Sequence, residues 1–163
     1  MQKITPFLWL DDNAEEAVNF YTSIFPNSKI VNLSRYGDAG PGPKGQVMVA
    51  TFELAGQRFM ALNGGPRHKF TEAISLMVNV ETQAELDNLW TKLLPGGRED
   101  ACGWLKDKYG LSWQIVPTAL IEMMSDKDPE RSKRVMEAML KMVKLDIQTL
   151  RQAYEGAQDA SRR

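Results

Sequence analysis

The segment Asn13–Pro26, NAEEAVNFYTSIFP, aligns along its whole length with Thr82–Pro95, TQAELDNLWTKLLP. Four positions are identical, at Glu16/Glu85, Asn19/Asn88, Thr22/Thr91 and Pro26/Pro95. Apolar residues recur in both segments at spacings of three and four, which predicts an amphipathic helix, and each run stops at a proline, which a helix rarely continues through. The pair therefore predicts an internal repeat, and the flanks can be compared from there.

The residues before each predicted helix carry a start signal. Asp12 precedes Glu15 by three positions, and Thr82 precedes Glu85 by the same spacing. A short polar side chain followed three residues later by glutamate predicts a capping box, in which the two residues bond the unpaired backbone N–H groups of the first turn.

Short apolar runs surround both helices in the same order. They predict strands at residues 4–10, 29–36, 46–54 and 58–62 in the first half, and at 73–80, about 98–106 as a hairpin, and 111–116 in the second. Strand, helix and three strands thus occur twice. This order predicts an α+β fold of paired βαβββ modules, about 1–67 and 68–122, which form one domain over residues 1–125 with the two sheets curled around a shared cleft.

The last part of the chain has no counterpart in the repeat. Asp128-Pro129-Glu130 is a helix start, with a capping aspartate and a proline in the first turn. Apolar residues then follow at spacings of three and four from Met136 to Tyr154, which predicts one amphipathic helix within residues 126–156 and a disordered tail over 157–163. The apolar stripe would pack on its own subunit or across a dimer interface.

Composition excludes several classes of protein. The 163 residues carry 20 basic and 21 acidic side chains, so a basic surface for nucleic acid is not expected. No apolar run approaches the ~20 residues that span a bilayer, and no signal peptide is recognisable, so no membrane association is expected. Cys102 is the only cysteine, which favours a reducing, cytoplasmic location.

Several stretches together resemble a known family. They are Asp12–Ala17 with Phe20-Tyr21, then Phe25–Ser28, Phe59–Pro66 and Cys102–Pro117. They are similar to the PhnB-like branch of the glyoxalase/bleomycin-resistance/dioxygenase (vicinal oxygen chelate) superfamily, over residues 3 to about 155. The resemblance implies paired βαβββ modules, a homodimer and a ligand cleft lined by the sheets. Many members of this branch carry the name 3-demethylubiquinone-9 3-methyltransferase.

The resemblance also provides a test for metal chemistry. Metal-dependent members of the superfamily take ligands from positions that correspond here to Thr5 or Pro6, Met60, Ser75 and Gln114. Of these only Gln114 is a credible donor, whereas a catalytic ion needs about three. No metal and no cofactor are therefore expected. The glycine-rich segment 37–45 lies between two predicted strands and is read as a hairpin loop, since a cofactor-binding turn would lead into a helix.

Two further side chains, those of His68 and Cys102, are of types that are reactive in many proteins. His68, the only histidine, lies in the basic run Pro66–Lys69, where it is read as solvated, with a general base or an anion contact as the alternatives. Cys102 is read as a small packed residue, with a nucleophile activated by Lys106 or Lys108 as the alternative. No catalytic residue is assigned.

The candidate site follows from strand alternation. One face of the first strand carries Phe7 and Trp9 with Thr5, and the equivalent faces of the later strands carry Ser75, Met77 and Asn79, then Ser112, Gln114 and Val116. The predicted ligand-binding residues are Phe7, Trp9, Met60, Asn63, Asn79 and Gln114. This set predicts a metal-free cup for a small, partly apolar organic molecule. The alternative is a metal-independent enzyme on such a molecule, including the methyl transfer of the family name.

Overall fold

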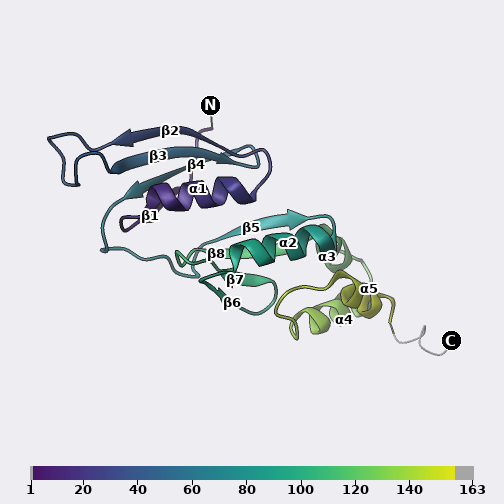
Figure 1. The fold of residues 1–163 in the computed structure, drawn as a ribbon. Helices are drawn as coiled ribbons and strands as arrows, with labels where there is room; N and C mark the ends of the chain where they lie inside the picture. Colours follow the sequence, from purple (N-terminus) through teal and green to yellow (C-terminus); the bar gives the residue numbers. More distant parts are fainter. Residues whose placement is uncertain (1, 157–163) are drawn as a thin grey trace. The chain divides into compact units, whose positions relative to one another are not determined.

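The computed structural model describes residues 2–156, and these divide into two compact units with the boundary after Phe70. Each unit holds one copy of the predicted repeat (Figure 1).

The first unit contains one helix and a four-stranded sheet. Its elements are β1 (Phe7–Leu10), α1 (Ala14–Ile24), β2 (Lys29–Arg35), β3 (Val47–Leu54) and β4 (Gln57–Asn63). The strands lie in the order β1-β4-β3-β2, with β1 parallel to β4 and the other pairs antiparallel. The segment 37–45 joins β2 to β3, so it is the hairpin loop that the sequence predicts.

The second unit repeats this arrangement. Its elements are β5 (Ser75–Val80), α2 (Gln83–Leu93), β6 (Arg98–Glu99), β7 (Trp104–Lys106) and β8 (Ser112–Pro117). The strand order β5-β8-β7-β6 matches the first sheet position by position, again with one parallel pair, β5 and β8. The predicted α+β fold of two βαβββ modules is confirmed.

Each sheet buries one face beneath its own helix. In β1, Leu8 and Leu10 are buried while the alternate residues are not, and β3 and β4 show the same alternation. The buried face of α1 is the one that the sequence predicts, and it consists of Ala14, Ala17, Val18, Tyr21 and Ile24. In the second unit Leu86, Leu89, Trp90 and Leu93 of α2 are buried in the same way.

The two helices begin differently, and one predicted cap is wrong. Thr82 caps α2 as expected, because its hydroxyl accepts a hydrogen bond from Glu85 N at 3.2 Å. Asp12 does not cap α1. The helix begins after Asn13, and its first N–H, that of Ala14, donates to Asn63 Oδ1 at 2.8 Å. Asn63, at the end of β4, therefore caps α1 in place of Asp12.

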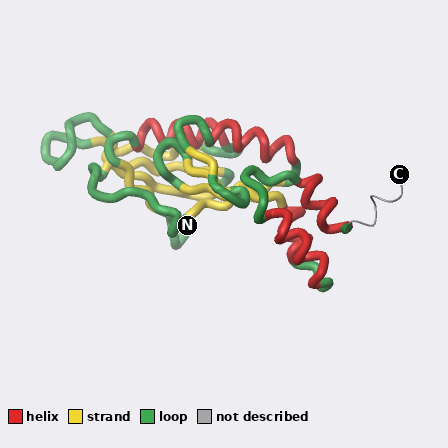
Figure 2. Tube along the Cα trace, turned by 90° about the horizontal axis from the view of Figure 1, so that it is seen from below, coloured by secondary structure: helices red, strands yellow, loops and turns green. Residues whose placement is uncertain are grey.

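The C-terminal part contains three helices: α3 (Thr118–Met124), α4 (Pro129–Met139) and α5 (Ile147–Glu155). The single helix expected within 126–156 is therefore wrong, although its start at Asp128 is right, since Asp128 Oδ1 accepts from Glu130 N at 3.0 Å. Figure 2 shows α4 and α5 as separate helices joined by a turn. The predicted tail, 157–163, lies outside the described residues.

The turn between α4 and α5 is held by the rest of the second unit. Cys102 N donates to Met142 O at 2.9 Å, and Gly103 N donates to Val143 O at 2.7 Å. These carbonyls would bond within the helix if it continued, so their use by another segment explains the break. Gln83 of α2 secures the next residues, because its side chain bonds Leu145 O at 3.1 Å and Ile147 N at 2.9 Å.

Side chains of this C-terminal part are buried within the second unit. Val135, Leu145 and Leu150 are fully buried. Within residues 2–156 no helix is long and apolar enough to cross a membrane.

Candidate functional site

Each sheet has a second face, opposite its helix, and this face carries the candidate residues. In the first unit the register places Phe7 beside Met60 and Trp9 beside Leu62. In the second it places Met77 beside Gln114 and Asn79 beside Val116. We call these surfaces the open faces, one in each unit. The alternation along the strands is the one that the sequence predicts.

On the open face of the first unit, Trp9 is held by the loop that follows β4. Its Nε1 donates to Gly65 O at 2.9 Å, and its ring meets His68 edge-on with 4.8 Å between centroids. The indole also lies close against Gly64, where an added Cβ would come within 2.3 Å of the Trp9 ring. Gly64 therefore allows the close approach of an aromatic side chain.

Asn63 belongs to the covered face and has a structural role. Its Oδ1 accepts from Ala14 N, and its Nδ2 donates to Val47 O at 2.9 Å. The residue is buried and both ends of its amide are engaged inside the unit. We therefore remove Asn63 from the candidate ligand contacts.

On the open face of the second unit, Gln114 lies at the centre. It is paired with Met77 on one side and Trp104 on the other, and its Nε2 donates to Ser75 Oγ at 2.8 Å. Asn79, two residues beyond Met77, is exposed. Of the three polar residues in the predicted ligand-binding set, Gln114 and Asn79 thus lie on this face.

A row of polar residues crosses the same face of the sheet, two residues along the strands from Met77, Gln114 and Trp104. Ser75, Ser112, Lys106 and Arg98 come from β5, β8, β7 and β6 and are neighbours in register. Glu72, just before β5, is ion-paired with Lys106 and with Arg98, the latter at 3.1 Å. The hydrogen bond from Lys106 is the main reason that the pKa of Glu72 lies below its ordinary value. We call these five residues the polar row.

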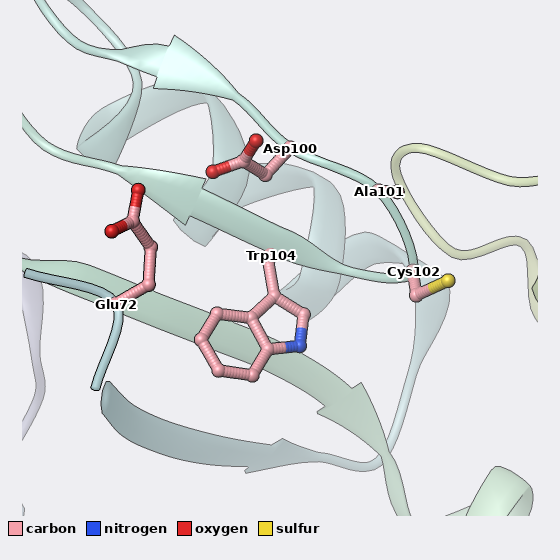
Figure 3. A pocket seen from close by; sticks show the side chains of 5 residues that line it. All are labelled: Glu72, Asp100, Ala101, Cys102 and Trp104. Atoms are coloured by element: carbon pink, nitrogen blue, oxygen red, sulfur yellow. The ribbon is translucent and has the colours of Figure 1, made fainter. Parts of the chain in front are cut away.

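A pocket of about 370 Å³ opens beside the polar row. Glu72, Asp100, Ala101, Cys102 and Trp104 line it (Figure 3). In the picture the Cys102 sulfur points away from the Trp104 indole. Charged groups and an aromatic wall therefore share this pocket.

Other reactive residues have structural roles or stand apart. Asp107 is buried, and its carboxylate accepts hydrogen bonds from Tyr109 N, Leu111 N and Trp113 Nε1. It holds the turn between β7 and β8. His68 is exposed, with its ring against Trp9.

Sequence reasoning missed Trp104, Arg98 and Glu72 as site residues. Trp104 lies on β7, which has only three residues, too few to show an alternation. The signal that could have found Trp104 is its pairing with Gln114, because two residues that pair across neighbouring strands lie on the same face of the sheet. Glu72 lies in a loop, where no periodicity indicates the direction of a side chain.

Comparison with known proteins now identifies the family. The family model for 3-demethylubiquinone-9 3-methyltransferase matches residues 2–116, which include both βαβββ modules. The chain belongs to this family. Helices α3, α4 and α5 follow the matched region.

Solved structures support the assignment. The Bacillus cereus PhnB protein is 46% identical, with a TM-score of 0.67, and the match covers 71% of this chain and 99% of that one. Protein PA1353 from Pseudomonas aeruginosa is 22% identical, with a TM-score of 0.60 over 72% of this chain and 98% of that one. The fosfomycin resistance protein FosX from Listeria monocytogenes, complexed with Mn(II) and sulfate, is 14% identical, with a TM-score of 0.50 over 72% and 91%. The last two show the fold alone. Among curated proteins none matches.

The metal site that the resemblance would imply does not fit the residues of this chain. The positions that would supply ligands hold Met60, Ser75 and Gln114, with Thr5 or Pro6 at the first. Gln114 already donates its amide to Ser75, and a thioether is a poor ligand for the hard cations that prefer oxygen. Within the described part of the chain, no three His, Cys, Asp or Glu side chains gather in one place.

Proposed function

We propose that this member of the family binds a small, partly apolar organic molecule on the open faces of its sheets. The observation that carries the proposal is the exposure of large apolar side chains on the face of each sheet opposite its helix. Phe7 is 49% exposed and Met77 is 52% exposed, although both belong to strands that are paired within a sheet. Contiguous exposed apolar surface beside hydrogen-bonding groups is characteristic of binding sites.

Apolar and polar residues of the open faces would make different contacts with a ligand. Phe7, Trp9 and Met60 offer apolar contact in the first unit, worth about 25 cal/mol for each Å² removed from water. In the second unit Met77 and Trp104 offer the same, and Gln114 and Asn79 provide amide groups that would orient a ligand. A ligand that leaves a polar group without a hydrogen-bond partner at these amides would bind less tightly. Gln114 and Asn79 would therefore discriminate between ligands.

Four tryptophans make the proposal testable residue by residue. Trp9 and Trp104 lie on the open faces, whereas Trp90 and Trp113 are buried and bond Glu99 and Asp107 through Nε1. We would titrate the ¹⁵N-labelled protein with a library of small aromatic compounds and follow the four indole N–H signals. Binding on an open face is expected to shift the signal of Trp9 or Trp104 and leave those of Trp90 and Trp113 in place.

Substitution then assigns the contacts. Trp9→Ala should weaken a ligand that shifts the Trp9 signal, and Gln114→Ala should weaken one that shifts the Trp104 signal. Asn19→Ala, on an exposed position of α1, is the control and should leave affinity unchanged. Compounds that shift only Trp90 and Trp113, or that bind both variants as well as the parent, would contradict the proposal.

The methyl transfer in the family name is the second candidate, and family membership is the observation that favours it. It requires a bound methyl donor as well as an acceptor. Native mass spectrometry after incubation with S-adenosylmethionine distinguishes the two: our proposal expects no donor adduct, and methyl transfer requires one. The same spectrum tests the homodimer that we propose from the resemblance, and a monomer at all concentrations would contradict it.

A further inference from the structure

The polar row contains two cations and one carboxylate. Lys106 and Arg98 provide an ammonium and a guanidinium group that both pair with Glu72, and Arg98 also lies 4.0 Å from the Asp100 carboxylate. Lys106 is well enclosed, its side chain 18% exposed, whereas the Glu72 side chain is 52% exposed and belongs to a loop. The cation is therefore fixed in the sheet, and the anion that satisfies it comes from outside the sheet.

One hydroxyl of the row has no partner. Ser112 Oγ is buried and makes no hydrogen bond with any group in residues 2–156. Its neighbours in register are Ser75 on β5 and Lys106 on β7. A buried hydroxyl that makes no hydrogen bond is destabilising, because it has lost its bonds to water without replacement, so such a group marks a place where a partner is missing.

A pocket of about 370 Å³ lies beside the row. Glu72 itself, Asp100 and Trp104 are among the residues that line it, and the strand neighbour of Trp104 is Gln114. A molecule that displaced Glu72 from Lys106 and Arg98 would therefore have the Trp104 indole beside it (Figure 3).

We propose that the polar row binds the carboxylate of a small aromatic or otherwise apolar acid, and that Glu72 is an internal carboxylate which this ligand displaces. The inference rests on the proposed function and names its ligand class. Lys106 and Arg98 would pair with the incoming carboxylate, Ser112 would donate to it, and the apolar body would lie against Trp104.

The exchange is energetically feasible because it replaces one carboxylate by another. The Glu72 side chain is half exposed, so water solvates its carboxylate once it is released and offsets part of the lost ion pair. Glu72 is ionised at neutral pH, since its pKa lies below the ordinary glutamate value, and it therefore competes with the ligand as a full charge. The gain comes from apolar contact and from the hydroxyl of Ser112.

The test compares benzoate with its neutral isostere benzamide, by titration of the Trp104 indole N–H signal. In the parent protein benzoate should bind more tightly than benzamide. Glu72→Gln removes the competing charge and should tighten benzoate binding about threefold to fivefold, within the small energy of an exposed ion pair. Lys106→Met keeps the aliphatic stem and should weaken benzoate at least fivefold. Neither change should alter benzamide binding.

Glu53→Gln is the matched control. Glu53 is likewise shared between an arginine and a lysine, Arg58 at 3.1 Å and Lys29 at 3.5 Å, but it lies in the first unit. It should leave benzoate binding unchanged. A thermal unfolding curve for each variant confirms that it is folded.

The outcomes separate this inference from the proposed function. Equal binding of benzoate and benzamide at Trp104, or a Glu72→Gln protein that binds benzoate no more tightly than the parent, would overturn the carboxylate site while the open face still binds small molecules. If no aromatic compound of the wider library shifts the signals of Trp9 or Trp104, the proposed function fails together with it.

Discussion

Asn63 and Ala14 are joined by a hydrogen bond of 2.8 Å from the backbone N–H of Ala14 to Asn63 Oδ1. Asn63, the last residue of β4, thus caps the first turn of α1, and its Nδ2 also donates to Val47 O on β3. One buried amide therefore connects a helix and two strands of the first unit.

The Asn63→Ala variant should lose both bonds and leave Ala14 N and Val47 O without these partners. We expect a loss of about 1–3 kcal/mol in the free energy of unfolding, measured by denaturant titration. Asn79→Ala removes the same side chain from an exposed position of β5 and should change stability by less than about 0.5 kcal/mol. Equal effects of the two changes would show that Asn63 does not link these elements.

Gly64→Ala should displace the Trp9 indole. The new Cβ would lie within 2.3 Å of Trp9 ring atoms and 2.6 Å of Leu62 Cδ1, so the side chains must move. Overpacking of this kind costs about 1–3 kcal/mol. The Trp9 indole signal should shift in the same variant, because its bond to Gly65 O depends on this contact.

Gly37→Ala provides the control for that experiment. Nothing lies within 4 Å of a Cβ added there, and its backbone is not in the left-handed region. The variant should unfold like the parent, with Trp9 unchanged. An unchanged Trp9 signal in Gly64→Ala itself would contradict the packing that we describe.

The arrangement of strands and helices could be predicted because its causes are local. Leu8 and Leu10 face the helix and Phe7 and Trp9 face away simply because side chains alternate along a strand, and the repeat makes each module a check on the other. Some roles that depend on the chain nearby could be predicted in the same way. The cap at Thr82 is an example.

Features that depend on distant partners could not be predicted. Asn63 caps a helix that begins far earlier in the chain, and the helix expected through residues 140–146 ends because Cys102 and Gly103 bond the carbonyls of Met142 and Val143. A spacing of three and four is compatible with one long helix or with two short ones. Only Asp146, which caps α5 by accepting from Thr149 N at 2.7 Å, marked the second start.

Acid should remove a stabilising contact of the C-terminal helices. The hydroxyl of Tyr154 on α5 donates to the Asp126 carboxylate before α4, and this bond is the main cause of the lowered pKa of Asp126. A carboxyl whose pKa is lower in the folded than in the unfolded protein stabilises the fold when it is ionised. The contribution is therefore present above the ordinary value of 3.8 and is lost as the pH falls through the lowered folded pKa.

Tyr154→Phe tests this dependence, since it removes the hydroxyl and keeps the ring. The parent should have the higher Tm near neutral pH, and the difference between the two proteins should shrink as the pH is lowered below 3.8. Thr22→Val, which removes a hydroxyl that bonds only α1 carbonyls, is the control and should show a difference that does not vary with pH. A pH-independent difference for Tyr154→Phe would contradict the assignment.

The turn between α4 and α5 should be an integral part of the second unit and not a loose appendage. Leu145 is fully buried there, and Leu140, five residues earlier, is 61% exposed. Leu145→Ala is expected to cost about 2–5 kcal/mol, because it removes buried methyl groups and leaves a cavity. Leu140→Ala makes the same chemical change at the surface and should cost less than about 0.5 kcal/mol. Unfolding followed by the Trp113 signal, from the sheet of the same unit, decides the point: if the turn belongs to that core, Leu145→Ala lowers the midpoint for the sheet itself. A variant in which α4 and α5 melt early while Trp113 keeps the parent midpoint would show instead that the C-terminal helices are a separate folding unit.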